Sequence, residues 1–180
     1  MSHFTAAVVR GSKGWTVSDL ELRGVSDIED VADRLRDVDL DADISLLFVE
    51  IDEEYLVVLR LDEGEDLRVF GSDSAVVEES RLGAVLVADL EPPDHGIEIP
   101  DDPDEADAGD DGDAGEDEES GAPGVDADPI GDVDLLADLG VPAPQLLALC
   151  AQEGSLPSDV TTEICDLFGC ADDVEDLRGA

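Results

Sequence analysis

Basic residues are scarce in this chain of 180 residues, which has nine Lys and Arg against 50 Asp and Glu and a formal net charge of -41. Binding to nucleic acid or to an anionic membrane depends on clustered Lys and Arg that displace counterions. We therefore expect neither direct nucleic-acid binding nor membrane binding. A basic protein surface is the partner that this charge suits.

Residues that carry catalytic chemistry are also few, with only two His and three Cys. The sequence has no Cys-x-x-Cys pair, no Gly-x-Ser-x-Gly elbow and no P-loop. We therefore expect no catalytic residue, no cofactor and no metal ion. Cys150 and Cys165 are interpreted as small buried apolar side chains with free thiols. Because no signal peptide or long apolar run occurs, we expect a cytoplasmic protein. No pattern indicates an oligomeric state.

One stretch of acids partly matches a calcium-binding pattern. Asp39, Asp41, Asp43 and Glu50 stand at positions 1, 3, 5 and 12 of an EF-hand loop. Position 6, which needs Gly for the sharp bend, is Ile44, and a strand-like run follows it in place of a helix. We interpret the match as chance in a very acidic chain.

Composition divides the chain into three segments. Residues 89–134 hold 20 acids and no Lys or Arg, with few large aliphatic side chains among them. Such a segment cannot bury enough apolar surface to offset an ordering entropy of about 1–2 kcal/mol per residue. We predict an α+β domain over residues 1–90, an acidic disordered linker over 91–131 and a short helical bundle over 132–180.

The first segment predicts an antiparallel sheet of about five strands with one or two helices. The strand-like runs are Phe4–Val9, Trp15–Leu22, Ile44–Ile51, Tyr55–Leu61 and Leu67–Phe70. Ser26 and Glu29 predict a capping box at the start of a helix that ends near Val38. Residues 75–90 favour a covering helix. We expect Trp15 and Tyr55 to pack in the core or on the sheet.

The last segment predicts four short helices. Their ends are marked by glycines, and prolines stand near two of the starts. The glycines are Gly140, Gly154, Gly169 and Gly179, and the prolines are Pro142 and Pro157. A segment this short cannot bury its own apolar side chains, and the sheet has a face in need of cover. We therefore predict that the C-terminal helices pack on the N-terminal domain.

Several motifs together resemble a known family. They are Phe4-Thr-Ala-Ala-Val-Val9, Gly14-Trp15, Ile44-Ser-Leu-Leu-Phe-Val-Glu50, Arg68-Val-Phe-Gly-Ser-Asp73, Asp134-Leu-Leu-Ala-Asp-Leu-Gly140 and Gln145-Leu-Leu-Ala-Leu-Cys-Ala151. In this order the chain resembles the tRNA adenosine deaminase-associated proteins of actinobacteria. The resemblance covers both predicted folded segments. It implies association with the deaminase that converts adenosine to inosine in tRNA, and it carries no functional residue.

The deaminase reaction itself needs zinc ligands and a glutamate in the pattern H-x-E and P-C-x-x-C. Neither half is present, because His3 precedes Phe4-Thr5, His95 precedes Gly96-Ile97 and no Cys-x-x-Cys occurs. The leading hypothesis is a non-catalytic accessory protein that binds tRNA adenosine deaminase or another basic protein surface. Its candidate partner-binding residues are Asp101, Asp102, Asp104, Glu105, Glu116, Asp117, Glu118 and Glu119.

Two alternatives stay open. The α+β domain could be a small-ligand-binding protein or an enzyme that uses its carboxylates, for which a concave, partly apolar site with a desolvated acid is the expected mark. The charge could also serve only solubility.

Overall fold

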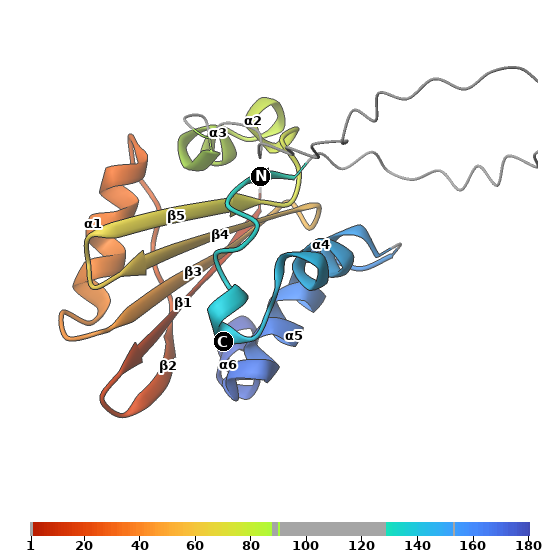
Figure 1. Ribbon diagram of the computed structural model, residues 1–180. Coiled ribbons are helices and arrows are strands. Elements are labelled where there is room, and N and C mark those ends of the chain that lie inside the picture. The colour runs from red at the N-terminus through yellow and green to blue at the C-terminus, as the bar shows by residue number, and fades with distance from the viewer. Residues whose placement is uncertain (1, 88–89, 91–128, 153) are drawn as a thin grey trace, which may run out of the picture.

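The computed structural model describes residues 2–87, 90, 129–152 and 154–180. In these residues a six-stranded antiparallel sheet is covered by helices on both faces (Figure 1), with the strand order β2-β1-β3-β4-β5-β6. The predicted α+β class is confirmed, with one strand more than expected.

Five of the six strands lie where the sequence predicts them. The strands are β1 (His3–Gly11), β2 (Gly14–Ser18), β3 (Ile44–Ile51), β4 (Tyr55–Asp62), β5 (Asp66–Gly71) and β6 (Ile130–Gly131). The prediction for β3 is correct at both ends. The second strand ends at Ser18 rather than at Leu22. Beyond Ser18 the carbonyl oxygen of Leu20 accepts a hydrogen bond from the Thr5 hydroxyl at 2.7 Å instead of joining the sheet.

Strand β6 lies in the last two residues of the segment assigned to the linker. Ile130 and Gly131 pair with Gly71 and Phe70 of β5. Gly131 has a φ of 90°, and a Cβ atom there would lie 2.1 Å from the carbonyl oxygen of Val69. Only glycine fits this approach, and a strand of two residues has no periodicity from which to predict it.

Helix α1 (Ile28–Val38) begins one residue later than the predicted capping box implies. Asp27 is the N-cap, and its carboxylate accepts a hydrogen bond from the backbone N–H of Asp30 at 2.9 Å. The Asp30 carboxylate in turn accepts one from the backbone N–H of Ser26 at 2.9 Å. Asp27 thus caps the helix in place of Ser26, and the Asp30 carboxylate binds the N–H of the residue before the cap, so the predicted reciprocal pair of Ser26 and Glu29 does not form.

One face of the sheet is covered by α1 together with the short helices α2 (Val76–Glu79) and α3 (Arg81–Val87). The covering helix favoured for residues 75–90 is confirmed in the part of that range that the structure describes, as two short helices. Most strand side chains on this face are apolar and buried, and α1 contributes Val31 and Leu35. Tyr55 packs at the margin of this core.

The other face is covered by the C-terminal helices α4 (Ala143–Ala151), α5 (Pro157–Phe168) and α6 (Ala171–Gly179). A 3₁₀ turn, η1 (Ala137–Leu139), stands where the first of the four helices was predicted. Gly140 and Gly169 end their helices in the left-handed conformation, whereas Gly179 is the last residue of α6 and α4 ends at Ala151, three residues before Gly154. Apolar residues of the sheet and of these helices form one core. The predicted packing of the C-terminal helices on the N-terminal sheet is confirmed.

Trp15 and Phe168 join β2 to the end of α5. Their rings stack with centroids 4.8 Å apart and an interplanar angle of 14°. Trp15 therefore packs on the sheet as the sequence predicts, and the only Trp of the chain reports on the contact between sheet and helices.

Candidate functional site

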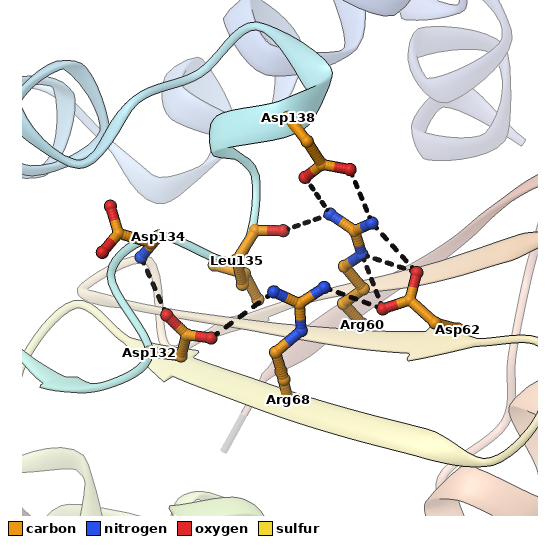
Figure 2. A network of polar contacts seen from close by, with 7 residues as sticks. All are labelled: Arg60, Asp62, Arg68, Asp132, Asp134, Leu135 and Asp138. Carbon is orange, nitrogen blue, oxygen red and sulfur yellow. Dashed lines mark hydrogen bonds and ion pairs between the residues drawn. The ribbon is translucent and has the colours of Figure 1, made fainter.

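A network of charged side chains joins the sheet to the chain that follows the acidic segment (Figure 2). Its members, called here the Arg60 network, are Arg60, Asp62, Arg68, Asp132 and Asp138. Arg60 lies in the middle of β4 among apolar neighbours, and its side chain is 4% exposed. A charge buried this deeply needs oppositely charged and hydrogen-bonding partners.

Arg60 has those partners on both sides of its guanidinium. Its Nε donates to both carboxylate oxygens of Asp62 at 3.0 Å, and its Nη2 donates to Asp138 at 2.8 Å. The Nη1 atom donates to Asp138 and, at 2.6 Å, to the carbonyl oxygen of Leu135. The planar guanidinium thus binds two carboxylates and a carbonyl, an arrangement that Lys could not reproduce.

Arg68 of β5 extends the network. It is the direct cross-strand partner of Arg60, so two like charges face each other. The Asp62 carboxylate lies between them and accepts a hydrogen bond from Arg68 Nη2 at 2.8 Å. Arg68 Nη1 also lies 3.7 Å from Asp132, whose other oxygen accepts the backbone N–H of Asp134 at 2.9 Å (Figure 2). The carboxylates offset the cross-strand repulsion.

The electrostatics keep these groups charged. Burial acts to raise the pKa of Asp62, but the hydrogen bonds from Arg68 and Arg60 outweigh it and lower that pKa below its ordinary value. The hydrogen bond from Arg60 lowers the pKa of Asp138 and raises that of Arg60 itself. A general acid or base needs a pKa near neutrality. The Arg60 network is therefore suited to anchoring the chain rather than to proton transfer.

The anchored chain meets the sheet beside the point where residues 91–128 begin and end. A Cβ atom on Gly131 would lie 3.0 Å from Leu90, and one on Gly71 would lie 2.9 Å from Ile130 and 3.5 Å from Val87. The residues that flank the acidic segment on its two sides are thus neighbours at the β5–β6 edge. The Arg60 network holds the C-terminal flank to the sheet.

A second ion pair, with a buried carboxylate, joins β3 to α6. Glu50 is 8% exposed, and one of its carboxylate oxygens accepts a hydrogen bond from Arg178. The Arg178 guanidinium also lies 4.7 Å from the centroid of the Phe4 ring. Burial raises the pKa of Glu50, although Arg178 and Thr161 act to lower it. Glu50 is the desolvated acid that the enzyme alternative called for, but it is bound to a cation of its own chain.

The candidate partner-binding acids, Asp101 to Glu119, lie outside the residues that the structure describes, as does His95. Of the four acids of the EF-hand pattern, the first three precede β3, whereas Glu50 lies near the other end of that strand and is bound to Arg178. No group of three or more His, Cys, Asp or Glu within residues 2–87, 90, 129–152 and 154–180 is arranged to hold a metal ion.

The three cysteines are free thiols in the structure, as predicted. Cys165 is completely buried and Cys170 is 2% exposed, whereas Cys150 is half-buried. Burial raises the pKa of Cys150 to about 12, and a hydrogen bond between the other two thiols raises the pKa of Cys165 and lowers that of Cys170. Cys165 therefore acts as a small core residue.

Sequence reasoning missed Arg60 and the residues around it. A signal was present, since Arg60 interrupts the apolar run Tyr55–Leu61 two residues after Val58, on the face where Val58 points into the core. Nothing in the sequence indicates that Asp138 is the partner, because 78 residues separate the two.

A protein-family model described as Rv3753c-like tRNA adenosine deaminase-associated protein matches residues 3–171. The chain belongs to this family. The match runs from β1 to the start of α6. It includes the whole Arg60 network and Glu50, but not Arg178. It confirms the family resemblance inferred from the sequence motifs. No curated protein and no solved structure matches the chain.

The family description indicates association with tRNA adenosine deaminase. Among the helices that the structure describes, none has the length and apolar character required to cross a bilayer.

Proposed function

We propose that this protein is a non-catalytic, cytoplasmic accessory protein that binds tRNA adenosine deaminase and acts through its acidic segment. The observation that carries the proposal is membership of the deaminase-associated family over residues 3–171. The charge supports it, since residues 89–134 hold 20 acids and no Lys or Arg. An enzyme that binds tRNA needs a basic surface, which is complementary to such a segment.

The arrangement of the folded part supports the same proposal. Arg60 and Arg178 are bound to carboxylates of their own chain, and these ion pairs join the sheet to the C-terminal helices. The flanks of the acidic segment meet at one edge of the sheet. In this proposal the folded part presents the acidic segment, and Asp101, Asp102, Asp104, Glu105, Glu116, Asp117, Glu118 and Glu119 bind the basic surface of the deaminase in competition with tRNA.

The test is a binding titration between the purified full-length chain and purified tRNA adenosine deaminase from the same genome. We expect a complex whose affinity falls steeply with salt between low and physiological ionic strength, because the contact is electrostatic. Unlabelled tRNA should displace the accessory protein. Absence of a complex at low salt would contradict the proposal.

A matched pair of variants distinguishes binding by the acidic segment from a general effect of the net charge. The first variant neutralises Glu116, Asp117, Glu118 and Glu119 to the corresponding amides. The control neutralises four exposed acids of α6, which are Asp172, Asp173, Glu175 and Asp176. We expect the first variant to weaken binding at least threefold more than the control. Equal losses would mean that only net charge matters, as the solubility alternative implies.

A further inference from the structure

A hollow between the N-terminus, the chain after β2 and helix α3 differs in charge from the rest of the protein. It has a volume of about 360 Å³ and is lined by ten residues, none of which is Asp or Glu. Three other hollows in the described part of the chain each contain at least two acids, such as Asp19 and Glu21, Asp33 and Glu65, or Glu50 and Glu53. In a chain with 50 acids the absence of acid in this wall is a distinctive property.

The wall of this hollow, called here the Arg81 hollow, is apolar with a basic rim. Leu22, Val25, Ile51, Leu82 and Val85 supply the apolar part. Arg81 and His3 are exposed and stand at the rim. The size is within the range of sites for small ligands, and a mostly apolar wall with a few convergent polar groups is typical of such sites.

Arg81 is available to a ligand in a way that most other arginines are not. Arg36, Arg60, Arg68 and Arg178 each lie within ion-pair distance of a carboxylate, whereas no carboxylate of the described residues lies that close to Arg81. Asp52 is not among the residues that line the hollow, and its carboxylate accepts a hydrogen bond from the backbone N–H of the lining residue Ser2 at 2.7 Å. The Ser80 hydroxyl accepts one from the N–H of Gly83 at 3.2 Å.

We propose that the Arg81 hollow binds a carboxylate carried on a short apolar body. The apolar body would lie against Leu22, Val25 and Leu82, and the carboxylate would pair with the Arg81 guanidinium, which binds carboxylates with two parallel hydrogen bonds. A monoanion suits the site better than a phosphate dianion, because the net charge of -41 repels anions in proportion to their charge. This site is basic, unlike the carboxylate site of the enzyme alternative, and it does not depend on association with the deaminase.

The experiment is an NMR titration of the uniformly ¹⁵N-labelled full chain with 4-phenylbutyrate and with its neutral analogue 4-phenylbutan-1-ol. We expect 4-phenylbutyrate to shift the amide signals of Val25, Leu82 and Val85 with a Kd on the order of 1 mM, since a ligand of this size gains little energy per atom. The alcohol should bind at least threefold more weakly. Equal affinity for acid and alcohol, or shifts confined to other residues, would overturn the proposal.

Two variants with the same change of charge test the role of Arg81. Arg81→Gln should weaken 4-phenylbutyrate at least threefold and leave the alcohol unchanged. Lys13→Gln removes an exposed base in the β1–β2 turn and should change neither. The NMR spectrum of each ¹⁵N-labelled variant shows whether that variant is still folded. If both variants weaken the acid equally, the binding follows net charge and the proposed site is wrong.

A third ligand identifies the source of the carboxylate. The peptide acetyl-Gly-Gly-Leu with a free C-terminus presents the same chemistry as the end of a protein, and its C-terminal amide is the control. If the free acid shifts the same amides more strongly than 4-phenylbutyrate, the natural ligand is a peptide C-terminus. If only 4-phenylbutyrate binds, it is a small-molecule carboxylate.

Discussion

The two faces of the sheet are covered by helices that are held in different ways. On one face α1 follows β2 closely in sequence, and its arginines bind backbone carbonyls, as Arg34 does with the carbonyls of Glu21 and Arg23, and Arg36 with that of Gly64 at 2.7 Å. On the other face the helices come from the far side of the acidic segment. There Arg60 and Glu50, both buried, form ion pairs with the more exposed Asp138 and Arg178, which lie in segments distant in sequence.

This difference follows from chain connectivity. Short connections on the α1 face leave few alternative positions for the helix, so apolar contacts and a cap are sufficient. The C-terminal helices are not restricted by a short connection, and apolar contacts alone are not directional. Buried ion pairs contribute little net stability, but a wrong placement leaves a charge without its partner. We infer that the Arg60 network and the Glu50–Arg178 pair specify where the C-terminal helices sit.

The largest expected effect concerns the apolar cores themselves. Leu35 of α1 and Leu146 of α4 are both completely buried, so Leu35→Ala and Leu146→Ala should each lower the free energy of unfolding by about 2–5 kcal/mol. Urea denaturation, followed by Trp15 fluorescence and by far-UV circular dichroism, measures both. We expect the two signals to coincide in each variant. If Leu146→Ala loses the Trp15 signal first, the two faces unfold separately.

The next effect tests the ionic anchor. The double variant Asp62→Asn with Asp138→Asn leaves the buried Arg60 without a carboxylate, and we expect a loss of about 3 kcal/mol. The matched control is Asp33→Asn with Asp37→Asn, two exposed acids of α1. It changes the net charge equally and should alter stability by less than about 0.5 kcal/mol. Equal effects in the same urea assay would show that the two faces do not differ in this respect.

Helix caps give a smaller contrast. Asp27→Ala removes the side-chain acceptor at the start of α1 and should cost about 1 kcal/mol. Helix α5 has Leu156 at its N-cap, 45% exposed and without an acceptor. Leu156→Ser should therefore raise the free energy of unfolding by up to about 1 kcal/mol. Thermal denaturation of the two variants and the parent chain shows whether each change lowers or raises stability. A lower stability of Leu156→Ser would indicate that the leucine contributes packing.

The smallest effect concerns pH. The pKa of Glu50 is raised above its ordinary value of 4.5, so the folded state binds this proton more tightly than the unfolded state. Its contribution to stability therefore falls as the pH rises through the folded pKa. Asp62 and Asp138 have lowered pKa values, so their contribution is present above the ordinary value of 3.8 and is lost as the pH falls through the folded pKa. The two anchors have opposite pH dependence.

The variant Glu50→Gln tests the contribution of Glu50 to the pH dependence of stability. At pH 7 we expect the free energy of unfolding to change by less than about 1 kcal/mol, since burial opposes the charge that Arg178 favours. The difference between variant and parent should increase as the pH rises above 4.5 and then level off. Glu163→Gln, an exposed acid of α5, is the control and should show no such trend. A Glu50→Gln difference that does not vary between pH 4.5 and 7 would contradict the assigned direction.

The extent to which sequence predicts this structure differs between local and distant features. Alternating or continuous apolar residues located β3 correctly, and Gly140 and Gly169 located the ends of η1 and α5. The predicted start of α1 was one residue too early, because Ser26 and Asp27 are both good caps and only the tertiary fold selects one. Strand β6 and the Asp138 partner of Arg60 were missed because neither has a local signal. The division into three domains and the role of the acids between Asp101 and Glu119 stay predictions.

The proximity of Leu90 to Gly131 has an evolutionary consequence. Because these two flanks lie side by side, the folded body fixes only the two ends of the chain between them, and the free energy of connecting two fixed ends grows only slowly with the number of residues. Insertions, deletions and duplications of acidic codons are therefore nearly neutral for folding. Selection can adjust the length and charge of this segment to a changing partner while the two cores and their anchors stay as they are.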